Sequence, residues 1–78
     1  MKEETTDRPF VYRPYRKAEL AQLYMPNESP QTATRRFNSW LRFSPLLWGR
    51  LQAADFTMTA RKLTYEQVKI IVDYLGVP

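Results

Sequence analysis

The sequence has 78 residues, of which 44% are hydrophobic and 26% are charged, and its formal net charge is +4. This length allows one domain at most, and the hydrophobic content excludes an intrinsically disordered tail. The chain contains neither Cys nor His, which excludes disulfides, the usual zinc ligand sets, a nucleophilic Cys and a His base. None of the eight carboxylates has the spacing of a hard-metal cage, although two could still meet across the fold. We therefore expect a non-enzymatic protein with no metal, cofactor or small-molecule substrate.

Positive charge is concentrated in the middle of the chain. Residues 31–62 contain six basic residues against one acidic residue, Asp55, so this segment carries +5. A basic segment attracts phosphate groups or anionic lipid, and it can equally be a solvated surface. Arg61 and Lys62, just before the last predicted helix, are either a solvated pair or a phosphate contact.

The chain shows no sign of export or of a membrane anchor. It begins MKEETTDRP, which is polar where a secretory signal needs an apolar stretch. Its apolar runs are far shorter than the ~20 residues of a membrane span. We expect a cytoplasmic protein without membrane contact.

Residues 1–14 are predicted to be a flexible tail that docks on the domain at most in part. Pro9 and Pro14 favour extended backbone before them, since a residue preceding proline avoids the helical region. Phe10 and Tyr12 either pack on the domain or form a partner-binding peptide. Residues 15–78 are expected to form a single helical domain.

Two helices are predicted in the first half of the domain. Strong helix formers run from residue 16 or 17 to 24, and Pro26 ends this helix. Ser29 followed by Pro30 is typical of an N-cap and a first helical residue, so a second helix should begin there and reach about Phe43.

Two further helices and one strand-like segment follow. Ser44 and Pro45 predict a third helix that ends at residue 53 or 54. Residues 55–63 alternate apolar and polar side chains, which indicates an edge strand or an extended connector, with residues 10–12 as a possible partner. Thr64 and Gln67 form a capping box for the last helix, and Gly76 is its C-terminal cap.

The sequence thus predicts a mainly α fold, a small four-helix domain with a helix-turn-helix-like pair and at most a short two-stranded element. The expected core is apolar and comes from all four helices and from the segment before the last one. Its members are Leu20, Leu23, Phe37, Trp40, Leu41, Leu47, Leu51, Leu63, Val68, Ile71, Val72 and Leu75.

The two helices at 17–24 and 30–43 fit the plan of a helix-turn-helix unit, whose second helix presents a polar face to the DNA major groove. On this plan Gln31, Thr32 and Arg35 read bases, since they lie near the helix start. The remaining candidates reach bases or phosphates and are Arg36, Asn38, Ser39, Arg42 and Arg50. An ordinary helical hairpin with solubilising arginines is the competing interpretation. The connection MPNESP is longer than the usual three or four residues.

Two resemblances bear on function. ELAQLY followed by TATRRFNSWL resembles MerR-type and excisionase-type winged helix-turn-helix domains, as does the later ARKLTYEQVKII. That resemblance implies DNA binding by the second helix, with a predicted helix, SPLLWGRLQAA, in place of the wing. Residues 13–78 also resemble a family of short bacterial domains of unknown function. They share RPYRKAELAQLYMP, a Trp-bearing second helix and LTYEQVKIIVDYLGVP. This second resemblance implies no activity.

We therefore expect a module that binds double-stranded DNA, as a regulator or an accessory factor. A single recognition helix offers little interface, so specific binding would require a homodimer or a companion protein. The alternative is a protein–protein interaction module that uses an exposed aromatic surface. Its candidate contact residues are Trp48, Tyr74, Phe10 and Tyr12.

Overall fold

The structure is a computed structural model and describes residues 10–78. In this range the chain forms four helices and one pair of short strands, which confirms the predicted mainly α fold. The elements in chain order are β1 (Tyr15–Arg16), α2 (Lys17–Tyr24), α3 (Pro30–Arg42), α4 (Pro45–Ala53), β2 (Lys62–Leu63) and α5 (Tyr65–Leu75).

The helix boundaries follow local capping chemistry. Ser29 caps α3, because its hydroxyl oxygen accepts a 3.2 Å hydrogen bond from the backbone N–H of Thr32. Thr64 and Gln67 exchange hydrogen bonds of 3.2 and 3.1 Å at the start of α5, as the capping box predicts. Gly76 ends α5 with a φ of 92°, a left-handed conformation that favours glycine.

The two strands pair antiparallel, with Tyr15 opposite Leu63 and Arg16 opposite Lys62. The backbone N–H of Lys17 extends the pairing with a 2.7 Å bond to the carbonyl of Arg61. The expectation that residues 10–12 supply the partner strand was therefore wrong.

The alternating segment before β2 is also not a strand over most of its length. Local hydrogen bonds hold it in turns: the N–H of Phe56 bonds to the carbonyl of Leu51, and that of Ala60 to Thr57. Asp55 has a φ of 65°, which its short polar side chain tolerates. These turns satisfy the backbone without a ladder partner.

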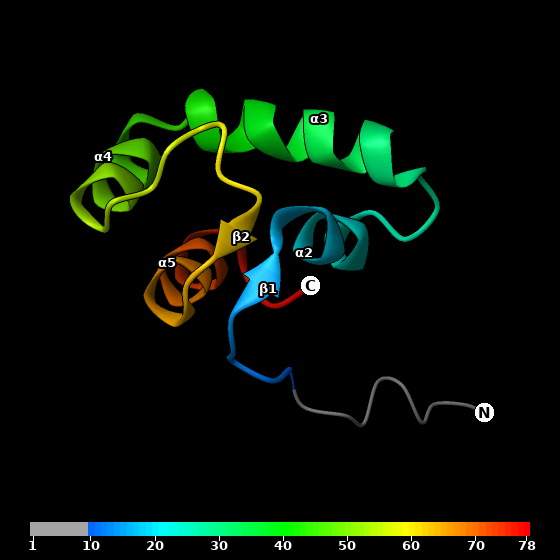
Figure 1. The fold of residues 1–78 in the computed structure, drawn as a ribbon, viewed down its shortest axis with the longest axis horizontal. Helices are drawn as coiled ribbons and strands as arrows, with labels where there is room; N and C mark the ends of the chain where they lie inside the picture. Colours follow the sequence, from blue (N-terminus) through cyan, green and yellow to red (C-terminus); the bar gives the residue numbers. More distant parts are fainter. Residues whose placement is uncertain (1–9) are drawn as a thin grey trace.

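Figure 1 shows how the helices are arranged around the strand pair. The long helix α3 runs along one side of the molecule, with α2 packed beneath its N-terminal half. Helix α4 follows α3 at its far end and packs against α5, and the two strands lie between α2 and α5. In this view the segment between α4 and β2 rises to the C-terminal end of α3 and then descends to β2.

The core contains most of the predicted residues and several others. Tyr15 and Phe56 join it from outside the helices, together with the small residues Ala21 and Ala33 on the facing sides of α2 and α3. Leu75 is only partly buried and packs against the edge. The predicted residues that are buried are Leu20, Phe37, Leu41, Leu47, Leu51, Leu63, Val68, Ile71 and Val72.

Two predicted core residues are exposed, and both expectations were wrong. Leu23 is 45% exposed because α2 buries its 17, 20 and 21 positions, a face that excludes residue 23. Trp40 is 38% exposed because α3 buries every fourth residue, Ala33, Phe37 and Leu41. The Trp40 ring packs in an edge arrangement against the rings of Tyr24 and Phe37, with centroids 6.2 and 6.3 Å away.

Candidate nucleic-acid interface

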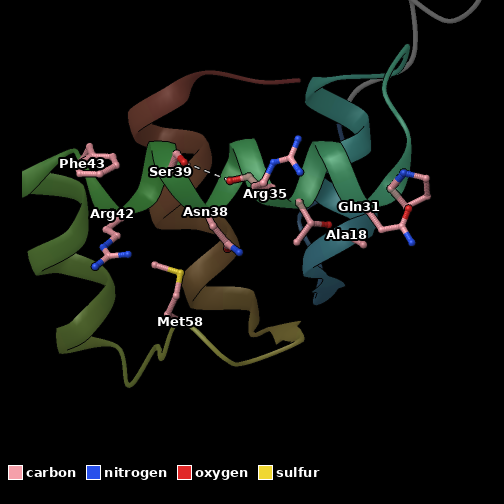
Figure 2. A pocket seen from close by; sticks show the side chains of 10 residues that line it. Ala18, Gln31, Arg35, Asn38, Ser39, Arg42, Phe43 and Met58 are labelled. Atoms are coloured by element: carbon pink, nitrogen blue, oxygen red, sulfur yellow. Dashed lines mark hydrogen bonds between the residues drawn. The ribbon is translucent and has the colours of Figure 1, made fainter.

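A groove of about 610 Å³ runs along the polar face of α3 (Figure 2). Gln31, Arg35, Asn38 and Arg42 lie along it at i, i+4, i+7 and i+11, because this spacing keeps residues on one side of a helix. Asn38 and Arg42 point toward Met58, which lies across the groove on the segment before β2. The full lining is Ala18, Pro30, Gln31, Thr34, Arg35, Asn38, Ser39, Arg42, Phe43 and Met58. We call it the α3 groove.

A smaller groove of about 360 Å³ shares one wall with the α3 groove. The two have Ala18, Thr34, Asn38 and Met58 in common, so they form one continuous depression. The smaller groove adds Arg16, Lys17, Thr59, Ala60 and Arg61. We call it the Lys17 groove.

The combined depression is strongly cationic. Its lining holds five basic residues, Arg16, Lys17, Arg35, Arg42 and Arg61. No Asp or Glu from the described part of the chain lines either groove. Walls of one charge sign concentrate the electrostatic field and attract ligands of the opposite charge, here anions.

The arginines of α3 differ in their ion pairing. Arg36 lies off the groove and forms a 3.2 Å ion pair with Glu28. Arg35 and Arg42 are exposed and pair with no carboxylate within residues 10–78. Their charges are therefore available to a ligand that enters the α3 groove.

The predicted DNA contacts do not all lie in this groove. Gln31, Arg35, Asn38, Ser39 and Arg42 line it, and the hydroxyl of Ser39 donates a 3.3 Å bond to the carbonyl of Arg35. The other three lie elsewhere. Thr32 is half-buried and accepts a 3.0 Å hydrogen bond from the Ser29 hydroxyl, Arg36 pairs with Glu28, and Arg50 is exposed on α4.

Lys17, the first residue of α2, was not anticipated as part of the site. It is only 4% exposed, and its ammonium donates a 2.6 Å hydrogen bond to the backbone carbonyl of Met58. The same nitrogen lies 5.1 Å from the centre of the Phe56 ring. Burial lowers the pKa of Lys17, because the charged form loses hydration there. Its spacing from Leu20 and Ala21 was the available signal, since it places Lys17 on their buried face.

Asn38 is the second unusual polar group of the depression. Its Oδ1 atom is buried and has no hydrogen-bond partner within the described chain. A buried amide oxygen without a partner is rare in folded proteins and calls for an explanation, such as a bound ligand or water. Asn38 lines both grooves, so this unmet acceptor lies where they join.

The aromatic residues predicted as a contact surface are dispersed. Trp48 is half-buried and packs edge-on against Phe56, and Phe10 stacks on Tyr15. Tyr12 and Tyr74 remain exposed, at 40% and 45%. Phe10 and Tyr12 contact each other edge to face, with ring centroids 5.2 Å apart, while Trp48 and Tyr74 lie on two other parts of the chain.

A different apolar hollow of about 520 Å³ lies beside the end of α3. Trp40 and the 76% exposed Phe43 provide most of its open aromatic surface. Its lining is Tyr24, Ser39, Trp40, Phe43, Ser44 and Leu75. This surface was not predicted from the sequence, because Trp40 was placed in the core.

The described residues contain neither a candidate metal-binding cluster nor a helix suited to span a membrane. No group of three or more Cys, His, Asp or Glu residues within 10–78 is placed to hold a metal ion. Over the same residues, every helix is too short or too polar to cross a bilayer.

The fold and the depression together define a small helical domain with a cationic groove along its longest helix. The chain belongs to the family described as Domain of unknown function (DUF4248), which it matches over residues 11–78. This confirms the resemblance to short domains of unknown function. Neither curated proteins nor solved structures gave a match. The resemblance to winged helix-turn-helix domains therefore remains a hypothesis.

Proposed function

We propose that this protein is a non-enzymatic module that binds double-stranded DNA through the polar face of α3. The observation that carries the proposal is the pair of arginines, Arg35 and Arg42, in a groove free of carboxylates from the described chain. Both side chains are exposed, so they can meet a phosphate or a base edge without breaking an ion pair formed within residues 10–78.

The side chains that lie along the α3 groove from Gln31 to Arg42 suit a DNA duplex. An arginine fork matches two acceptors of guanine or two phosphate oxygens, and the exposed amide of Gln31 matches the donor and acceptor pair of adenine. From Gln31 to Arg42 the helix rises about 16 Å, which corresponds to about five base steps. A stripe of this length fits along a major groove, which is about 12 Å wide.

The pairing of α2 with α3 supports the same proposal. The two helices pack together across a connection formed by residues 25–29, in the order that the winged helix-turn-helix resemblance implies. In such units the first helix braces the second against the DNA backbone. We propose a regulator or accessory factor in the cytoplasm that acts as a dimer or with a companion protein, since one such helix provides little specific interface.

Fluorescence anisotropy of a labelled duplex tests the proposal with two matched variants. The groove variant carries Arg35→Ala and Arg42→Ala, and the control variant carries Arg36→Ala and Arg50→Ala. Both remove two exposed arginines, but only the first removes them from the α3 groove. Each lost contact costs about 1–3 kcal/mol, so the groove variant should bind at least about thirtyfold more weakly while the control variant stays near wild type.

Two outcomes would overturn the DNA proposal. One is equal weakening in both variants, which would mean that only net charge matters. The other is no binding by the wild type even at ~50 mM salt, where phosphate contacts are strongest.

The open apolar hollow supports a second candidate, a protein-interaction module. Trp40 and Phe43 expose aromatic surface beside α3, and aromatic residues are enriched at protein interfaces. Sedimentation equilibrium of the wild type and of Phe43→Glu tests for a homodimer through this hollow. A dimer that the charge dissociates supports the candidate, whereas a monomer in both cases removes the homodimer form of it.

A further inference from the structure

Lys17 is a buried cation without a counter-ion in the described chain. Its ammonium has three donor hydrogens and uses one on the Met58 carbonyl. No carboxylate of residues 10–78 forms an ion pair with it. A buried charge is costly unless it is paired, so a counter-ion at this position would be stabilising.

Two more cations line the same groove, Arg16 from β1 and Arg61 from the position just before β2. Arg16 and Arg61 line the Lys17 groove, are exposed, and form no ion pair with a carboxylate of the described chain. The backbone bond from Lys17 to Arg61 holds these segments side by side. The groove thus carries three positive charges from α2 and from the two segments that pair beside it.

The neutral groups of the groove add hydrogen bonding of both kinds. Thr34 and Thr59 line it with hydroxyl groups, and Asn38 contributes the buried Oδ1 that lacks a partner. Rotation of the Asn38 amide by half a turn exchanges Oδ1 and Nδ2, so the position can accept or donate. At about 360 Å³ the groove is at the lower end of the range for ligand pockets.

We propose that the Lys17 groove is a binding site for a phosphate group, with Lys17 at its base and Arg16 and Arg61 at its rim. A phosphate monoester carries a charge of about −1.5 to −2 near neutral pH and three acceptor oxygens, which suits a groove lined by three cations. Arginine forks bind phosphate oxygens in pairs. A carboxylate offers two oxygens in one plane, so it leaves part of this donor set unused.

The site does not depend on the DNA proposal, because its principal group lies outside the α3 groove. The phosphate belongs either to a free phosphorylated compound or to a nucleic-acid backbone. Both sources offer tetrahedral phosphate oxygens, but a backbone diester carries one negative charge and a free monoester carries about 1.5 to 2. The variants below separate them.

The test is a two-dimensional NMR titration of the full chain with inorganic phosphate at constant ionic strength. The variants are Lys17→Met, which keeps the apolar stem, and Lys69→Met, the same change at an exposed lysine of α5. Arg61→Ala is a second site variant, at an exposed position where folding is not at risk.

Wild type and Lys69→Met should show saturable shifts at the amides of residues 17, 38 and 61. Lys17→Met and Arg61→Ala should bind at least about tenfold more weakly, since a lost charge-assisted bond costs about 1.5–3 kcal/mol.

The proposal is overturned if acetate at the same ionic strength gives the same shifts, or if Lys17→Met titrates like the wild type.

Duplex anisotropy on the same variants then identifies the source of the phosphate. If Lys17→Met loses phosphate but keeps DNA, the site takes a free phosphorylated compound. If it loses both, the site takes a backbone phosphate. The groove variant separates the two proposals: loss of DNA with retained phosphate leaves this site intact.

Discussion

The ammonium of Lys17 donates a 2.6 Å hydrogen bond to the backbone carbonyl of Met58, 41 residues further along the chain. The backbone N–H of Lys17 makes a second bond, of 2.7 Å, to the carbonyl of Arg61. One residue at the start of α2 therefore holds the segment that forms the far wall of both grooves. The side-chain bond also places the ammonium 5.1 Å from the centre of the Phe56 ring.

The buried Lys17 should make stability depend on pH in the alkaline range. Its pKa is lowered in the folded state by burial, while the unfolded side chain keeps a pKa of about 10.4. Between these two values the unfolded state binds more protons, so the free energy of unfolding rises as pH rises. Urea unfolding from about pH 7 to about pH 10, with Lys17→Met as reference, should show this rise in the wild type alone. A constant difference between the two proteins would contradict it.

The titration of Tyr24 should make the free energy of unfolding fall, rather than rise, at still higher pH. Its hydroxyl donates a 2.6 Å bond to the carbonyl of Gly76, and burial raises its pKa to about 12. An unfolded tyrosine titrates near 10, so the stabilisation is complete below that pH and is lost as pH rises toward about 12. Unfolding of Tyr24→Phe over this window should show a weaker loss of stability than the wild type. Parallel loss in both would mean that Tyr24 titrates normally.

Gln67 should be a critical polar residue for stability. It is 4% exposed, accepts a bond from the Thr64 N–H, and donates one of 2.8 Å to the carbonyl of Ala54. Gln67→Ala removes the capping box and leaves that carbonyl without its partner, at a cost of about 2 kcal/mol. Chemical denaturation should show this loss, whereas Glu66→Ala, at the exposed neighbouring position, should change stability by less than about 0.5 kcal/mol.

Adjacent leucines on α4 should respond very differently to truncation. Leu47 is fully buried and Leu46 is 60% exposed. Leu47→Ala should cost about 2–5 kcal/mol through lost packing and a residual cavity. Leu46→Ala should stay within about 0.5 kcal/mol of wild type in the same denaturation experiment. Similar losses in both variants would show that α4 is rotated from the orientation described.

The helices were predictable because their signals are local. Ser29 with Pro30, and Thr64 with Gln67, specify helix starts through contacts within a few residues. The strand partner was not predictable, because α2, α3 and α4 separate Tyr15 from Leu63 in the sequence. Two residues per strand also leave no periodic pattern in the sequence.

The candidate site was partly predictable for the same reason. The stripe from Gln31 to Arg42 follows from helix periodicity alone, and Arg35 and Arg42 do line one groove. Lys17 and Met58 meet through a contact between residues 41 positions apart. A local sequence pattern therefore cannot predict that both line the depression. The exposure of Trp40 likewise depends on how α2 meets α3.

The measurement that tests the central claim most directly is the salt dependence of duplex DNA binding by the wild type and by the groove variant. The account predicts that log K falls linearly with log salt for the wild type. It also predicts a shallower slope for the groove variant, by about one unit for each arginine that contacts a phosphate. Identical slopes and affinities for the two proteins would contradict the assignment of Arg35 and Arg42 as the DNA-facing residues of α3.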